Sequence, residues 1–227
     1  MQVIVIQHSQ SGHSGFIGDY VVERLGGTVR TLYSGALLEA SPEDLKADAV
    51  VVMGSARGVY ETHVPWIAQQ RALMKGLVDA GVPVFGVCFG AQLLATAIGG
   101  DVRPTGDFHL GWRENESAFA PVWKGPWVRW HGDHISLPAD VEVHARADGL
   151  VQAFRRGTAV GVQFHPEASG DMLERWSQET ALTGVLADQA SELVSYARRN
   201  EGRLRGEAYA LFDHVFELLL ADGAARR

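Results

Sequence analysis

The stretch Pro83-Val-Phe-Gly-Val-Cys-Phe-Gly-Ala-Gln-Leu-Leu-Ala95 decides the fold, because an apolar strand pattern passes directly into a helical one. Gly86 and Gly90 lie two residues to either side of Cys88. This is the thiol version of G-x-S-x-G, a sharp strand-to-helix elbow that exposes a nucleophile. The helix expected over residues 89–98 directs the positive end of its dipole at the sulfur and favours the thiolate. On this motif alone, a catalytic cysteine and an inert core cysteine both stay open.

The elbow is one step in an alternation of strands and helices. Apolar runs predict strands at residues 3–6, 28–33, 49–53 and 82–87. Helical periodicity predicts helices between them at residues 16–25 and 65–80. This spacing indicates a parallel sheet covered on both faces. We therefore expect an α/β fold with a mostly parallel central sheet flanked by helices.

The second half of the chain has a different pattern. In residues 101–164, short apolar runs alternate with turn signals, and this pattern predicts a small β-hairpin region of short strands. Beyond it, helices are predicted at about 171–178, 183–199 and 203–221. No linker composition separates these parts. We therefore expect residues 1–227 to form one domain, with a core of about 1–170 and a C-terminal helical extension of about 171–227.

Composition limits the class of protein. With 227 residues, 46% of them hydrophobic, the chain suits one globular domain with a real core. A formal charge of -7 argues against a nucleic-acid partner. The single cysteine allows no internal disulfide, and no apolar stretch reaches the ~18 residues of a membrane span. Since the N-terminus also lacks a signal-peptide pattern, we expect a soluble, cytoplasmic protein that binds neither nucleic acid nor membrane.

A thiolate nucleophile needs a base, and the base needs an orienting group. The segment Val160-Gly-Val-Gln-Phe-His-Pro-Glu-Ala168 supplies both, because an apolar strand ends at His165 and Glu167 follows across a proline. Glu167 can accept a hydrogen bond from one imidazole nitrogen while the other faces the sulfur. A His-Pro-Glu sequence alone is a common turn. Together with the elbow, it predicts a catalytic set of Cys88, His165 and Glu167.

The two motifs Gly86-Val-Cys-Phe-Gly-Ala-Gln92 and Gly161-Val-Gln-Phe-His-Pro-Glu167 resemble those of the class I (triad) glutamine amidotransferases. The resemblance covers about residues 1–170 and implies the flavodoxin-like fold of that family. In length and arrangement the chain most resembles stand-alone proteins similar to the amidotransferase domain of GMP synthase. These proteins hydrolyse the side-chain amide of L-glutamine without a cofactor, and the resemblance implies the same here.

The resemblance assigns a role to each member of the catalytic set. Cys88 would attack the glutamine amide to form a γ-glutamyl thioester. His165 would protonate the departing ammonia and then activate water, while Glu167 would orient the histidine and stabilise its charged form.

The resemblance also implies an oxyanion hole of backbone N–H groups. One donor would be Phe89, and the other would come from the loop after the third strand, at Gly54 and Ser55. Relatives usually have Gly-Gly-Pro in this loop, whereas this chain has Gly54-Ser-Ala56. A backbone donor does not depend on the side chain, but the preset shape given by a proline is lost. An ordinary strand-to-helix turn is the alternative.

Three further residues are implied to bind substrate. Gln92 lies one helical turn after Cys88 and would hold the amino-acid end of glutamine, although a surface or capping glutamine is the alternative. His131 and Asp133 match a His-x-Asp segment that borders the glutamine pocket, or form a turn with internal hydrogen bonds. Relatives often have glutamate in place of His109. No metal site is expected, because the histidines of the N-terminal loop lack partners at ligand spacing.

Reaction class is easier to predict than biological role. One hypothesis is a glutaminase that releases ammonia to a separate synthetase, since no ATP-binding motif is visible in the chain. A second is a γ-glutamyl hydrolase or peptidase that cleaves another γ-glutamyl amide and needs no partner. A third is a catalytically silent regulator, against which the intact catalytic set argues. The first two hypotheses use the same residues, so the sequence does not separate them.

Overall fold

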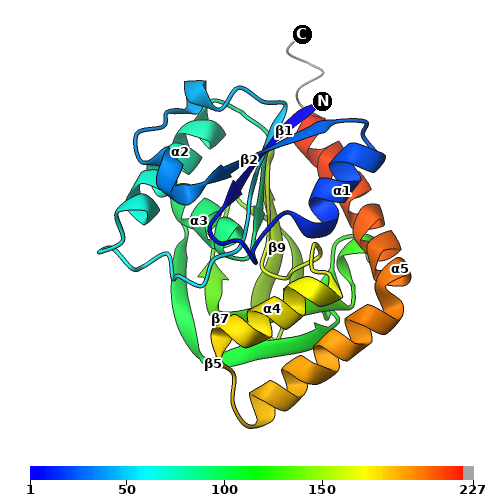
Figure 1. The fold of residues 1–227 in the computed structure, drawn as a ribbon. Coiled ribbons are helices and arrows are strands. Elements are labelled where there is room, and N and C mark those ends of the chain that lie inside the picture. Colours follow the sequence, from blue (N-terminus) through cyan, green and yellow to red (C-terminus); the bar gives the residue numbers. More distant parts are fainter. Residues whose placement is uncertain (222–227) are drawn as a thin grey trace.

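An eight-stranded sheet runs through the centre of the computed structural model, which describes residues 1–221 (Figure 1). The strand order is β2-β1-β3-β4-β10-β9-β8-β6. The first five strands are parallel: β2 (Thr28–Tyr33), β1 (Gln2–Gln7), β3 (Ala49–Val52), β4 (Val84–Val87) and β10 (Ala159–Val162). The last three are antiparallel: β9 (Leu150–Arg156), β8 (Glu142–Ala147) and β6 (Ser117–Ala118). The expected α/β fold with a mostly parallel sheet is confirmed.

Helices cover both faces of this sheet (Figure 1). On one face, α1 (Gly15–Glu23) and α5 (Val185–Leu220) pack on alternate strand residues such as Val3, Val5 and Val51. On the other face, α2 (Pro65–Asp79) and α3 (Phe89–Ala97) pack on the residues between them, such as Ile4 and Val50. Since successive strand side chains point to opposite faces, strands buried on both sides need a continuous apolar sequence.

A two-stranded ribbon of β5 (Asp101–Arg113) and β7 (Trp127–Ser136) stands apart from the main sheet. It is the expected β-hairpin region, together with the hairpin of β8 and β9 that extends the main sheet. Helix α4 (Gly170–Thr180) and part of α5 pack with the ribbon in a separate apolar cluster. Within the described residues there are also three short 3₁₀ turns: Ser34–Leu37, Pro42–Asp44 and Pro121–Trp123. The ribbon and α4 form one wall of the site described below.

The prediction of two helices over residues 183–199 and 203–221 is wrong, because α5 is continuous. Gly202 lies within it, where a glycine normally weakens a helix. One side-chain contact spans this position, because Arg203 donates to the hydroxyl of Tyr196. On either side of it, Arg203 donates to Glu207 one turn ahead, and Asn200 donates to the carbonyl of Tyr196 one turn behind. Packing of both ends, one on the ribbon and one on the main sheet, holds the long helix together.

The carboxyl ends of the parallel strands meet at one edge of the sheet. The loops that follow β1, β3, β4 and β10 all emerge there. Open α/β sheets bind ligands at this edge. Within residues 1–221, no helix is both long and apolar enough to cross a membrane.

Candidate active site

Cys88 occupies a strained elbow between β4 and α3. Its backbone has φ 51° and ψ -105°, a conformation that costs energy for a residue with a side chain. A Cβ at Gly86 would lie 2.6 Å from the carbonyl carbon of Gly90, and one at Gly90 would lie 2.0 Å from the carbonyl oxygen of Val52. Only glycine fits at both positions. The elbow read from the sequence therefore exists, and its glycines are required by close backbone approach.

His165 and Glu167 form a buried pair in the loop after β10. The imidazole Nδ1 lies 2.8 Å from Glu167 Oε1, and the two residues are only 6% and 1% exposed. The backbone N–H of His165 donates to the carbonyl of Val128 in β7, and Phe16 of α1 donates to the carbonyl of Glu167. Backbone hydrogen bonds from two other elements thus fix the geometry of the pair.

The charges around His165 set its protonation state. Burial lowers the pKa of His165, but the negative charges of Glu167 and Cys88 outweigh burial and raise the pKa to about 10. The imidazole is therefore protonated at neutral pH. A protonated histidine beside the sulfur stabilises a thiolate, which is the nucleophilic form of cysteine.

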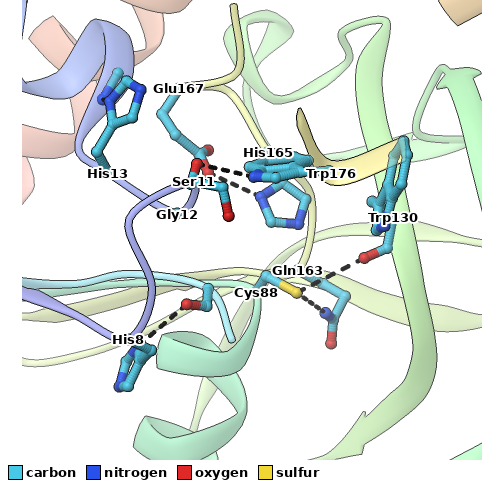
Figure 2. Close-up of polar contacts among 12 residues, drawn as sticks. His8, Ser11, Gly12, His13, Cys88, Trp130, Gln163, His165, Glu167 and Trp176 are labelled. Atoms are coloured by element: carbon cyan, nitrogen blue, oxygen red, sulfur yellow. Dashed lines mark hydrogen bonds and ion pairs between the residues drawn. The ribbon is translucent and has the colours of Figure 1, made fainter. Parts of the chain in front are cut away.

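The Cys88 sulfur also contacts two polar groups below the imidazole (Figure 2). The side-chain amide of Gln163 donates to Sγ at 3.6 Å, and Sγ lies 4.0 Å from the carbonyl oxygen of Trp130. The amide of Gln92 in turn donates to Gln163 Oε1 at 3.3 Å. Gln163 is 1% exposed and was not singled out from the sequence. The sequence signal that could have identified Gln163 is its place just before His165 in the same motif.

The loop after β3 approaches both Cys88 and His165. A Cβ built on Gly54 would lie 3.2 Å from His165 Cε1 and 3.8 Å from Cys88 Cβ. His8 Nδ1 lies 3.0 Å from the Gly54 carbonyl oxygen, and burial lowers the pKa of this histidine. His8 therefore helps to hold the loop, a role that the sequence did not indicate. The expected oxyanion donors Gly54 and Ser55 line the cavity at Cys88, and the third expected donor, Phe89, follows Cys88 at the start of α3.

A cavity of about 170 Å³ opens beside the sulfur. Trp176 of α4 lies over His165, with ring centroids 4.7 Å apart, and its indole N–H donates to the carbonyl of Ser11 at 2.9 Å (Figure 2). The sequence predicted the helix that carries Trp176 but gave the indole no role. The lining residues come from the segments after β1, β3, β4 and β10, from strand β7 and from α4: Ser9, Ser11, Gly12, Gly54, Ser55, Ala56, Cys88, Trp130, His165, Glu167, Trp176, Glu179 and Thr180.

The three residues expected to bind substrate lie outside this lining. Gln92 is buried and holds Gln163. His131 stacks on His109 with ring centroids 5.1 Å apart, and burial lowers the pKa of His131 to about 3. Asp133 accepts a hydrogen bond from the hydroxyl of Tyr60 at 3.1 Å. Across residues 1–221, no three His, Cys, Asp or Glu side chains are grouped as metal ligands.

An α/β sheet with a cysteine on a strand-to-helix elbow defines an enzyme of the nucleophile-elbow type. The chain belongs to the class-I glutamine amidotransferase family, whose model matches residues 24–175. Membership of this family makes the protein an amide-hydrolysing enzyme.

The names of two relatives describe different activities. A GMP synthase [glutamine-hydrolyzing] from Mycolicibacterium paratuberculosis is 35% identical over 188 residues, which are 72% of this chain and 34% of that protein. The chain thus spans about a third of the length of this relative. A gamma-glutamyl-L-1-hydroxyisopropylamide hydrolase from a Pseudomonas species is 29% identical over 193 residues, 73% of this chain and 60% of that protein.

Two solved structures share the fold over nearly the whole chain. A glutamine amidotransferase from Thermotoga maritima superposes with a TM-score of 0.78 at 24% identity and covers 96% of this chain and 98% of its own. A glutamine amido transferase from Methylobacillus flagellatus gives a TM-score of 0.82 at 23% identity, with 95% and 94% covered. The flavodoxin-like class I fold implied by the sequence motifs is confirmed.

Proposed function

We propose that the protein hydrolyses the side-chain amide of L-glutamine with Cys88, His165 and Glu167 as a catalytic triad. The observation that carries the proposal is the strained Cys88 elbow beside the buried pair of His165 and Glu167. The raised pKa of His165, which favours its protonated form, supports it. The Cys88 thiolate attacks the amide carbon, and His165 donates its proton to the departing ammonia. The C–N bond breaks and a γ-glutamyl thioester remains on the sulfur.

Hydrolysis of the thioester completes the cycle. His165, now neutral, takes a proton from water, and the resulting hydroxide attacks the thioester carbon. Glutamate leaves, and the thiolate–imidazolium pair is restored. Glu167 keeps Nδ1 protonated, so that Nε2 exchanges protons with ammonia and water.

In this proposal, backbone N–H groups of the Gly54–Ser55 loop and of Phe89 stabilise the tetrahedral oxyanion. The proximity of Gly54 to both His165 and Cys88 supports a position beside the reacting carbon. The burial of Gln92 and its bond to Gln163 support a positioning role for Gln92. His131 and Asp133 lie on the same strand as Trp130, and His131 Nδ1 lies 3.0 Å from the Asp133 carbonyl oxygen, which supports a positioning role for these two residues as well.

Two versions of this function differ in the group that leaves the substrate and in whether a partner accepts it. In the first, a separate synthetase accepts ammonia from this glutaminase, an arrangement supported by the relationship to part of a GMP synthase. In the second, the leaving group is a larger amine and no partner is needed. The Pseudomonas amide hydrolase is a relative of this kind.

Release of ammonia from L-glutamine by the purified protein tests the proposal, with γ-glutamyl alkylamides assayed in parallel for amine release. Cys88→Ala is the control for each substrate. We expect glutamate formation that disappears in the variant. Equal glutamate formation by the variant would contradict the proposal, and turnover of the alkylamides in preference to glutamine would favour the second candidate.

A further inference from the structure

The cavity at Cys88 contains a carboxylate that the triad chemistry does not use. Glu179 lies near the end of α4 and lines the cavity. The hydroxyl of Ser11 donates to Glu179 Oε2 at 2.5 Å, and Ser9 Oγ lies 3.1 Å from Ser11 Oγ. The Gly12 N–H donates to Ser9 Oγ at 3.0 Å. The loop after β1 thus holds this carboxylate in place at the wall of the cavity.

Two indole rings line the same cavity. Trp176 and Trp130 meet edge to face, with ring centroids 5.7 Å apart. The indole N–H of Trp176 is already bonded to the carbonyl of Ser11, so the hydrogen bond fixes the ring. The faces of indole rings attract ammonium groups through their π electrons. A fixed carboxylate beside indole rings is therefore suited to bind an organic cation.

The charges of the lining agree with this interpretation. Among the described residues that line the cavity there is no lysine or arginine, and the imidazolium of His165 is paired with Glu167, which leaves the charge of Glu179 unmatched. Glu179 accepts the Ser11 hydroxyl but forms no ion pair with any residue in the described range 1–221. The carboxylate is consequently available to an ammonium group that enters the cavity.

We infer that Glu179, together with Trp176, forms a subsite for an ammonium group of the substrate and so determines specificity. The inference rests on the proposed function, because the substrate is taken to be a γ-glutamyl amide. The ammonium group has two possible sources: the α-ammonium of the glutamyl part, or a second amino group on the leaving amine. Both present the same chemistry to the carboxylate.

Binding to the inactive Cys88→Ala protein tests the subsite without turnover. Isothermal titration is made with two pairs of probes: L-glutamine against its Nα-acetyl derivative, and γ-glutamyl aminobutylamide against γ-glutamyl butylamide. Only the first member of each pair has the ammonium group in question. Adding Glu179→Gln should raise the Kd of one first member roughly tenfold and leave its partner unchanged. The affected pair identifies the source. Glu39→Gln, an exposed site outside the cavity lining, is the charge-matched control.

The inference is overturned if Glu179→Gln changes both members of each pair equally, if it changes neither, or if no probe binds. Failure of the proposed function is a separate result, since it requires wild-type protein to leave all these amides intact. In that event, the Kd comparison in the Cys88→Ala protein still decides whether Glu179 binds the ammonium group.

Discussion

Replacing Glu167 by glutamine should lower the pKa of His165 by about three units while preserving the shape of the site. The carboxylate lies 2.8 Å from Nδ1, and both residues are buried. A unit charge about 4 Å from another contributes about 4 kcal/mol at an effective dielectric constant of ~20, which equals about three pKa units. The pKa of His165 should therefore fall from about 10 in the wild type to about 7 in the variant.

The assay is an NMR titration of histidine Cε1–H signals from mildly acidic to strongly alkaline solution, a range that includes the wild-type His165 pKa of about 10. His165→Asn assigns the relevant signal among the nine histidines of the chain. We expect this signal to titrate near neutral pH in Glu167→Gln and only in alkaline solution in the wild type. Turnover should fall by about 10³-fold or more, because the histidine loses the charge that orients it.

A second histidine–glutamate pair provides the control. His144 Nε2 lies 3.3 Å from Glu142 Oε2 on β8, but the Glu142 side chain is 63% exposed. Solvent screens such a pair, so Glu142→Gln should leave turnover unchanged. The reasoning is refuted if His165 stays protonated above pH ~9 in Glu167→Gln, since burial and the sulfur alone would then account for its raised pKa.

Three other outcomes follow from the site. Cys88→Ser should reduce glutamate formation at least about 10³-fold, because a hydroxyl ionises far less readily than a thiol; near-normal rates would exclude Cys88 as nucleophile. Gly54→Ala places a Cβ 3.2 Å from His165 Cε1 and should cost about 10²-fold in kcat, whereas Gly35→Ala, which has open space, should cost nothing. Because the folded-state pKa of His165 is raised, its stabilising contribution is complete below pH 6.5 and is lost as pH rises through about 10. Urea unfolding should therefore show the stability advantage of wild type over Glu167→Gln shrinking across that range, and a constant advantage would contradict the pairing.

The parts of the fold that the sequence predicted are those with local signals. Buried parallel strands require continuous apolar runs, and the Cys88 elbow requires glycine at positions 86 and 90 because backbone atoms would collide with any side chain. The long α5 was wrongly divided because local propensity at Gly202 opposes a helix, while packing at both ends favours one.

The candidate catalytic residues could be proposed from the sequence because they occur in short motifs at strand ends, and the structure brings Cys88, His165 and Glu167 together. The wall of the cavity could not be predicted from the sequence, since Trp176, Ser11 and Glu179 belong to distant segments that meet only through the fold. The contact between Gln163 and the sulfur likewise depends on the parallel pairing of β4 and β10. Periodicity does not report such tertiary contacts.

The central claim, that Cys88 carries the glutamyl group during turnover, is tested most directly by trapping the intermediate. Protein is mixed with L-glutamine, quenched in acid within the first turnover, digested and analysed by mass spectrometry. We predict one glutamyl group attached to the peptide that contains Cys88, absent from the Cys88→Ala protein. Turnover with no adduct, or an adduct on another residue, would contradict the account.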